Sequence, residues 1–182
     1  MDGEDPAARK AQLRRRMRRL RAGISGEAAD RTERSARLWR SVVDEIAERV
    51  SAANPAVMLF ESYPTEPDTA QWLADSRARG WQVFIPEVDG KELRILPGDI
   101  DPQVLDVVVV PGLAFTPDGR RLGQGGGHYD RLIARLGPHC LAIGVCYAEQ
   151  LLEELPTEAH DRTVDVVVTD ADENPVCRGS CR

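Results

Sequence analysis

The chain has 182 residues, of which 42% are hydrophobic and 30% are charged, and its formal net charge is −6. This length predicts a single domain whose core needs no disulfide or metal for stability. No apolar stretch is long enough to span a membrane, and the charged N-terminus is unlike a signal peptide. We therefore expect a cytoplasmic protein without a membrane partner, whose four cysteines are reduced.

The N-terminal segment is predicted to form a helix from about Pro6 to Ala22. Residues 9–21 carry eight cations and no acid, so this segment is either an arm that binds nucleic acid or an amphipathic helix that docks on the body. Leu13, Met17 and Leu20 recur at helical spacing and favour the docked helix. We therefore expect no nucleic-acid partner.

A second predicted helix, 26–50, is followed by apolar runs that alternate with helical stretches. Strands are expected at 57–60, 81–86, 93–96, 107–110, 141–146 and 164–170, and helices at 68–79, 128–136 and 147–154. Because the apolar runs are continuous and separated by helices, they predict strands buried on both faces of a mainly parallel sheet.

The expected fold class is therefore α/β, a three-layer α/β/α sandwich with a Rossmann-like, mainly parallel sheet. Residues 1–182 form a single domain in this prediction. The N-terminal helices occupy 6–50, the sheet core occupies 55–170, and a loose tail follows over 171–182. In such a fold, ligands bind beyond the carboxyl ends of the strands.

The cysteines fall in two settings. Cys140 and Cys146 lie in or beside the apolar run LAIGVCY and are predicted to be buried thiols. Cys177 and Cys181 lie in the polar tail. A metal site at this tail pair would need two further ligands nearby, and none is evident in the sequence.

The most informative stretch is residues 107–131, VVVVPGLAFTPDGRRLGQGGGHYDR. A buried strand leads into a loop with four glycines in five positions, and a predicted helix follows at once. Exposed N–H groups at such a helix start favour an anion, most naturally phosphate. The loop is neither a Walker loop nor a dinucleotide fingerprint. A plain surface turn is the alternative, and the flanking charges of Arg120, Arg121, Asp130 and Arg131 make a functional loop the better interpretation.

Three further segments accompany this block in chain order. They are Lys10-x-x-Leu13-Arg14 on the first helix, Glu66-Pro67-Asp68-Thr69 after the first strand, and LPTEAHDRTVDVVVTD at 155–170. With these motifs, the chain resembles the 5-formyltetrahydrofolate cyclo-ligase family, also called methenyltetrahydrofolate synthetase, over nearly its whole length. The GRRLGQGGGHYDR block is the most specific of the four.

The resemblance implies that 5-formyltetrahydrofolate and ATP are converted to 5,10-methenyltetrahydrofolate, ADP and phosphate, with Mg²⁺ as cofactor. In the family's mechanism, the formyl oxygen attacks the γ-phosphate, and the neighbouring ten-position nitrogen then closes the ring as phosphate leaves. Such phosphoryl transfer requires positioning and neutralisation of charge, and no protein nucleophile.

The resemblance also implies three sets of site residues. Those that bind ATP are Lys10, Arg14, Arg121, Leu122, Gly123, Gln124, Gly125, Gly126, Gly127, His128 and Tyr129. Those that contact folate are Arg14, Glu66, Gln124, Gly125, Gly126, Gly127 and His128. Those that bind magnesium are Asp130 and Asp161.

The residues alone allow plainer interpretations of the three acids. Asp130 can stabilise a helix N-terminus, Asp161 can pair with Arg162 in a surface loop, and Glu66 can be a solvated turn acid. Similarly, Tyr63, Phe115 and Tyr147 either line an apolar wall of the site or belong to the core.

One segment departs from the usual pattern of the family, because residues 87–106 are short. This departure motivates an alternative function: a paralogous ATP-dependent enzyme that acts on a different formyl or amide substrate. In either case the expected partners are small molecules, folate and ATP in the first, and we expect a monomer.

Overall fold

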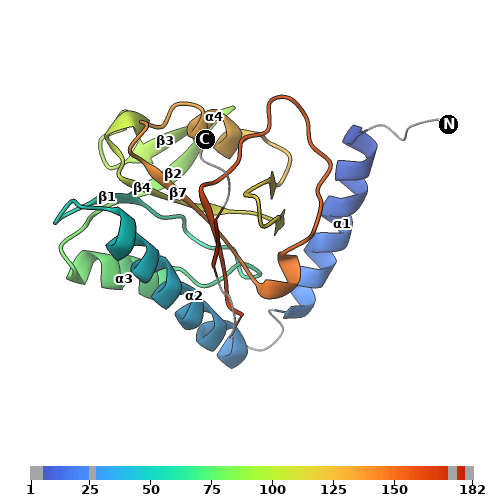
Figure 1. Ribbon diagram of the computed structural model, residues 1–182, viewed down its shortest axis with the longest axis horizontal. Coiled ribbons are helices and arrows are strands. Elements are labelled where there is room, and N and C mark those ends of the chain that lie inside the picture. Colours follow the sequence, from blue (N-terminus) through green and yellow to red (C-terminus); the bar gives the residue numbers. More distant parts are fainter. Residues whose placement is uncertain (1–5, 25–27, 172–175, 179–182) are drawn as a thin grey trace.

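The computed structural model describes residues 6–24, 28–171 and 176–178, and its centre is a seven-stranded sheet in the order β3-β2-β1-β4-β7-β8-β9 (Figure 1). The strands of this sheet are β1 (Ala56–Met58), β2 (Gln82–Asp89), β3 (Glu92–Leu96), β4 (Val107–Pro111), β7 (Leu141–Cys146), β8 (Val166–Thr169) and β9 (Val176–Arg178). The α-helices are α1 (Pro6–Ile24), α2 (Ala28–Arg49), α3 (Ala70–Ala78) and α4 (His128–Ile133). Two short 3₁₀ helices, η1 (Pro102–Val104) and η2 (Ala148–Gln150), and a separate hairpin of β5 (Ala114–Phe115) and β6 (Arg121–Leu122) complete the fold.

The five central strands are parallel, and only the edge strands β3 and β9 are antiparallel to their neighbours. Val57 of β1 lies opposite Val83 on one side and Val107 on the other, so the apolar runs of the sequence pair directly in the middle of the sheet. The parallel strands follow a doubly wound, flavodoxin-like order, whose direction of winding reverses between β1 and β4. The predicted α/β class and mainly parallel sheet are confirmed.

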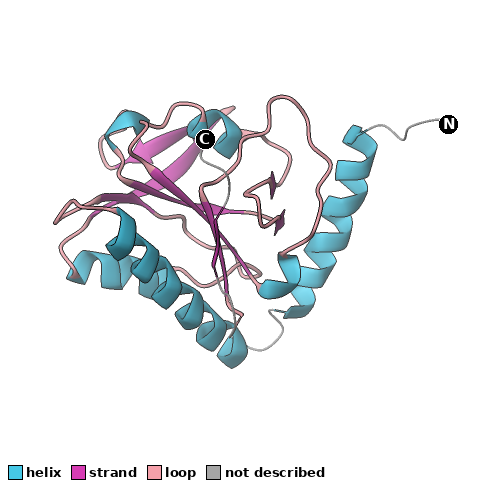
Figure 2. Ribbon diagram, in the orientation of Figure 1, coloured by secondary structure: helices cyan, strands magenta, loops and turns pink. Residues whose placement is uncertain are grey.

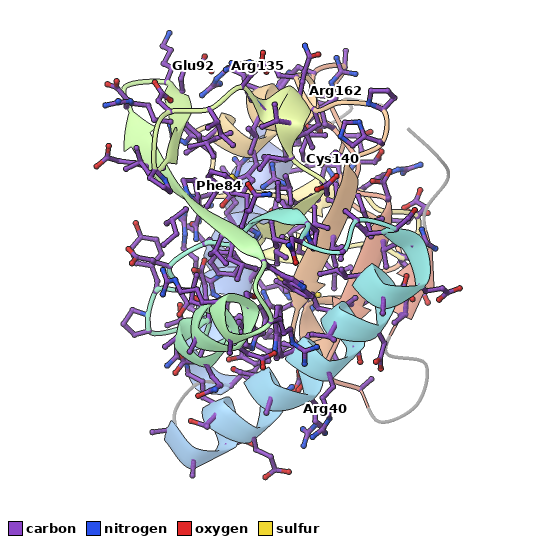
Figure 3. All side chains as sticks on the ribbon, turned by 90° about the vertical axis from the view of Figure 1, so that its left-hand side faces the viewer. Arg40, Phe84, Glu92, Arg135, Cys140 and Arg162 are labelled. Carbon is purple, nitrogen blue, oxygen red and sulfur yellow. The ribbon has the colours of Figure 1, made fainter. Side chains whose placement is uncertain are left out.

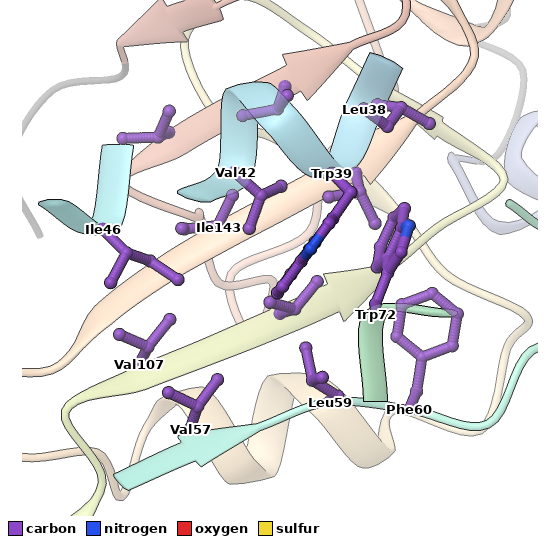
Figure 4. Packing of buried hydrophobic residues seen from close by; sticks show 14 of the residues in the cluster. Leu38, Trp39, Val42, Ile46, Val57, Leu59, Phe60, Trp72, Val107 and Ile143 are labelled. Carbon is purple, nitrogen blue, oxygen red and sulfur yellow. The ribbon is translucent and has the colours of Figure 1, made fainter. Parts of the chain in front are cut away.

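Helices cover the sheet on both faces (Figure 2), as predicted. On one face, Trp39 of α2 stacks on Trp72 of α3 with ring centroids 5.4 Å apart, and both pack against β1 and β4 (Figure 4). On the other face, Leu132 and Ile133 of α4 pack against the alternate residues of the same strands. Near α4, Arg135 and Glu92 of β3 approach to 3.9 Å (Figure 3).

The basic helix α1 lies apart from these two layers, along one side of the molecule (Figure 1). Met17 is fully buried and packs in a third small cluster with Leu113, Leu122 and Leu155. The docked amphipathic helix is therefore confirmed. Among the described helices, none combines the length and apolar character needed to cross a membrane.

Two predicted boundaries are wrong. Pro86 does not end its strand, because β2 continues to Asp89 by pairing with β3. Beyond Phe84, β2 has no partner strand on its β1 side, so a proline without an N–H is tolerated there. The predicted helix at 147–154 is only the turn η2, because Leu152 N–H instead donates to the Phe115 carbonyl at 2.8 Å.

Two elements are not predicted from the sequence. The first is the β5–β6 hairpin, in which Leu113 N–H donates to the Leu122 carbonyl at 2.8 Å. The second is β9, which lies in the tail predicted to be loose and pairs with β8. Residues 179–182, including Cys181 of the tail pair, lie outside the described residues. The predicted buried positions of Cys140 and Cys146 are confirmed.

Candidate functional site

A cleft of about 1210 Å³ opens at the carboxyl ends of β1, β2 and β4. It is lined by the segments that follow these strands, by the N-terminal half of α1 and by the loop that contains Glu158 and Asp161. The position beside the winding reversal is where ligands bind in open α/β sheets. A cleft large enough for a ligand therefore lies where the sequence predicts the site.

Every site residue named from the sequence lines this cleft. The lining includes Lys10, Arg14, Glu66, Asp161 and the whole stretch 121–130. The three aromatic residues named from the sequence lie in different places. Tyr63 lines the cleft, whereas Phe115 and Tyr147 belong to the apolar core. The sequence thus identified a set of residues that the fold brings together.

The glycine loop crosses the cleft between β6 and α4. Gly125 and Gly127 have φ values of 111° and 65°, in the region that favours glycine, so the loop conformation requires glycine at both positions. Arg14 Nε donates to the Gly123 carbonyl at 3.0 Å, and Arg18 donates to the Gln124 side chain at 3.0 Å and to its carbonyl at 3.1 Å. Two arginines of α1 therefore bind the loop.

Lys10 lies buried between two acids. Its Nζ donates to Glu158 Oε2 at 2.6 Å and to Asp161 Oδ2 at 2.6 Å. Burial disfavours the charged form of Asp161, but hydrogen bonds from Lys10 and from the Glu158 N–H outweigh burial and lower the pKa of Asp161. This pair joins α1 to the loop that precedes β8.

Arg121 lies almost fully buried beside the glycine loop. Its Nη2 donates to Asp130 Oδ2 at 3.0 Å, and its guanidinium lies 5.6 Å from the centroid of the Tyr129 ring. The other oxygen of Asp130 accepts the Arg162 N–H at 3.2 Å, so Asp130 lies next to the segment that contains Asp161. Burial raises the pKa of the Tyr129 hydroxyl despite the nearby cation, and the phenol stays neutral.

Glu66 also lines the cleft and is 5% exposed. Its Oε1 accepts from Arg21 Nη1 at 3.1 Å, and its Oε2 accepts the Tyr63 N–H at 3.0 Å. Glu66 is therefore a buried, paired carboxylate and not a solvated turn acid. Sequence reasoning missed Arg21 as a contributor to the site.

Arg18 was missed as well, although a signal for both arginines is present. Positions 10, 14, 18 and 21 are spaced by four, four and three residues, so they share one face of α1. All four side chains contact the loops around the cleft. This periodic row of cations could have been read from the sequence.

The segment that is short beside the family pattern forms part of the cleft wall. The turn between β2 and β3 approaches α4, where His128 Nε2 lies 3.3 Å from the Gly90 carbonyl oxygen. Arg131 Nη2 donates to the Gly126 carbonyl at 2.9 Å and also to the Lys91 carbonyl. Although this segment is short, its hairpin therefore reaches the glycine loop.

Comparisons with known proteins agree with one another. The profile of the 5-formyltetrahydrofolate cyclo-ligase family matches residues 95–170. The 5-formyltetrahydrofolate cyclo-ligase of Mus musculus is 27% identical over 192 residues, which cover 87% of this chain and 90% of the mouse protein. The enzyme of the same name from Haemophilus influenzae is 26% identical over 179 residues, covering 84% of this chain and 93% of that protein.

Among solved structures, the NMR structure of Aquifex aeolicus 5,10-methenyltetrahydrofolate synthetase superposes with a TM-score of 0.76 at 27% identity. The superposition covers 93% of this chain and 92% of the Aquifex chain. Sequence and structure therefore agree along nearly the whole chain, which resembles the 5-formyltetrahydrofolate cyclo-ligase family throughout.

Proposed function

We propose that this protein catalyses the ATP-dependent cyclisation of 5-formyltetrahydrofolate to 5,10-methenyltetrahydrofolate, with release of ADP and phosphate. The observation that carries the proposal is the cleft at the winding reversal of the sheet. In it, the glycine loop, the cations Lys10, Arg14 and Arg121, and the buried carboxylate of Glu66 line the same space.

The glycine loop and the cations around it suit a triphosphate. Main-chain N–H groups between Gly123 and His128 can donate to phosphate oxygens, and glycine lets the ligand approach the backbone closely. Lys10, Arg14 and Arg121 line the cleft and supply positive charge. Because phosphoryl transfer depends on positioning and charge neutralisation, these groups are sufficient to hold the nucleotide for reaction.

Glu66 suits the folate. A buried carboxylate can accept hydrogen bonds from the amino and ring N–H groups of a pterin, and such charge-assisted bonds are strong where water is excluded. Tyr63 is 70% exposed at the same cleft and offers an aromatic surface to a planar ring. Gln124 and His128 line the same cleft as these residues, which suits contacts to both substrates.

Asp130 and Asp161 fit a magnesium ion. Both are carboxylates that line the cleft, and the hydrogen bond between Asp130 and Arg162 N–H brings their segments together. Hard oxygen donors suit Mg²⁺, which keeps part of its water shell. When bound, Mg²⁺ supplies charge neutralisation at the phosphates. Arg121 and Lys10, which pair with these acids here, remain beside the same phosphates.

The proposed chemistry balances without a covalent enzyme intermediate. The formyl oxygen attacks the γ-phosphorus of ATP, and the bond from that phosphorus to the bridging oxygen breaks as ADP leaves. The ten-position nitrogen then attacks the activated carbon and loses its proton, and phosphate leaves with that proton and with the former formyl oxygen. The protein orients both substrates and stabilises charge on the transferred group.

The test is direct. Purified protein with Mg²⁺, ATP and 5-formyltetrahydrofolate should develop the near-ultraviolet absorbance of the methenyl product, with one ADP formed per product. Omission of ATP or of folate should abolish both signals. ADP release that does not depend on folate would contradict the proposal. A thermal shift with ATP but with no tested folate would instead favour a different formyl or amide substrate.

We further propose that the protein works in the cytoplasm as a monomer with small-molecule partners and no nucleic acid. The inward orientation of Lys10 and Arg21, which are 3% and 4% exposed, supports a role of α1 at the cleft. Light scattering would test the monomer, and retention on RNA or DNA at low salt would contradict the exclusion of nucleic acid.

A further inference from the structure

Arg21 is a buried cation that lies behind the cleft wall. Its side chain is 5% exposed, that of Glu66 is 6% exposed, and Arg21 Nη1 lies 3.1 Å from Glu66 Oε1. The same Nη1 also lies 3.4 Å from the Gly112 carbonyl oxygen. Arg21 therefore joins three segments: α1, the loop after β1 and the loop after β4. The last two follow the strands between which the winding reverses.

Glu66 faces the cleft, whereas Arg21 is absent from the described residues that line it. One donor occupies each oxygen of the Glu66 carboxylate, Arg21 on Oε1 and the Tyr63 N–H on Oε2. This pairing fixes the plane of the carboxylate and leaves a second lone pair on each oxygen for a ligand. Arg21 therefore contacts the carboxylate of a residue that lines the cleft.

We propose that Arg21 is a positioning residue, which holds the Glu66 carboxylate in the orientation that accepts N–H groups of the folate ring system. This inference rests on the proposed function. Arg21 contacts no reacting atom, so its removal should weaken folate binding through Glu66 and leave the nucleotide side of the cleft intact. That side is built from Lys10, Arg14 and the glycine loop, where Lys10 donates to Asp161 and Arg14 donates to the Gly123 carbonyl, whereas Arg21 donates to Glu66 and to the Gly112 carbonyl.

A second arginine contacts the same loop and provides a comparison with Arg21. Arg31 of α2 donates to the Glu66 main-chain carbonyl at 2.8 Å and to Asp68 Oδ2 at 3.3 Å. It therefore supports the backbone of the loop, whereas Arg21 supports the side chain. The two roles make different predictions, because only Arg21 couples directly to the charge of Glu66.

The experiment is a double-mutant cycle with Arg21→Gln, Glu66→Gln and the double variant, with KM measured separately for 5-formyltetrahydrofolate and for ATP. Each single change should raise the KM for folate about 10- to 100-fold. The KM for ATP should stay within about twofold of the wild type. The KM of the double variant for folate should be no higher than that of either single variant, because both changes act through the same carboxylate.

Two more variants keep the test decisive. Arg21→Lys retains the cation but cannot reach both oxygen partners, so it should recover part of the folate affinity. Arg19→Gln removes an exposed cation of the same helix and should change neither KM. Thermal unfolding checks that each variant folds. The double variant leaves no unpaired buried charge, so it remains informative if a single variant is unstable.

Two results would overturn the inference. One is a double variant whose rise in the KM for folate equals the product of the two single rises, and the other is an equal rise in the KM for ATP and for folate. The inference would also be overturned if the effects of Arg31→Gln and Glu66→Gln on the KM for folate were not additive, because general support of the loop would then explain the result. These outcomes differ from failure of the proposed function, in which the wild-type protein itself forms no methenyl product.

Discussion

Asp130 occupies a position where two roles meet. Its carboxylate pairs with Arg121 at 3.0 Å and accepts the Arg162 N–H at 3.2 Å, in the first turn of α4. A plain helix-dipole role would need neither contact. The carboxylate therefore aligns the Arg121 guanidinium at the cleft, and the proposed magnesium role would add to this alignment.

We predict that Asp130→Asn lowers kcat about 10- to 100-fold and raises the Mg²⁺ concentration needed for half-maximal rate. The amide keeps the shape of the side chain but removes its charge, so the fold should be retained. The matched control is Asp118→Asn, an exposed acid on the β5–β6 turn, which should leave both parameters unchanged. An Asp130→Asn enzyme with normal rate and normal Mg²⁺ dependence would refute the assignment.

At the scale of elements, the contacts of α1 explain why so polar a helix is held in place. Its apolar contribution is small, and buried ion pairs join it to the loops. Lys10 reaches Asp161, which is 151 residues away in sequence, and Arg21 reaches Glu66, 45 residues away. A buried cation without these partners would destabilise the fold, so α1 and the loops depend on each other.

This dependence predicts a pH effect at the Lys10–Asp161 pair. The pKa of Asp161 is lowered in the folded protein. Its contribution to stability is therefore complete above the unfolded pKa of about 3.9, and is lost as pH falls through the lower folded pKa. The difference in thermal midpoint between wild type and Asp161→Asn should accordingly be largest near about pH 6 and shrink toward about pH 3.

An exposed acid on α2 supplies the control for this measurement. Asp44→Asn should show a midpoint close to that of the wild type throughout the same pH range. If the difference for Asp161→Asn stayed constant with pH, the ion pair with Lys10 would contribute nothing through the charge of the carboxylate.

At the scale of the molecule, the fold has two parts. The sheet with α2, α3 and α4 is the rigid part, and α1 with the loops around the cleft is the dependent part, because the packing of α1 relies on its ion pairs with these loops. The sheet with α2, α3 and α4 forms two continuous apolar clusters, whereas α1 packs mainly in a third, smaller cluster. Elements with few buried apolar contacts open locally at a lower free energy than the core. A ligand that contacts both α1 and the loops should therefore order the dependent part.

We predict that a non-hydrolysable ATP analogue slows amide hydrogen exchange in α1 and in residues 123–127, because a ligand that contacts both segments stabilises their packing against each other. Exchange in α2, which lies outside the cleft, serves as the internal control and should not change. Hydrogen exchange followed by mass spectrometry resolves these segments. Unchanged exchange in both α1 and the loop would contradict nucleotide binding at this cleft.

The amino-acid sequence by itself determined the features that depend on local pattern. Continuous apolar runs predicted the central strands, since such runs suit a sheet that is covered on both faces. The glycine cluster predicted the loop, because positive φ at Gly125 and Gly127 needs glycine. The motifs also identified residues that share one cleft, including Lys10, Glu66 and Asp161.

Only the tertiary structure decided which partners meet across long separations. No local signal indicates that residues 151–152 bond to β5, that β9 pairs with β8, or that Arg21 turns toward Glu66. Such choices depend on which buried polar groups lie within reach once the sheet has formed, because each buried donor or charge needs a partner. A helix propensity at 147–154 and a proline at position 86 were therefore overruled by pairing with neighbouring strands.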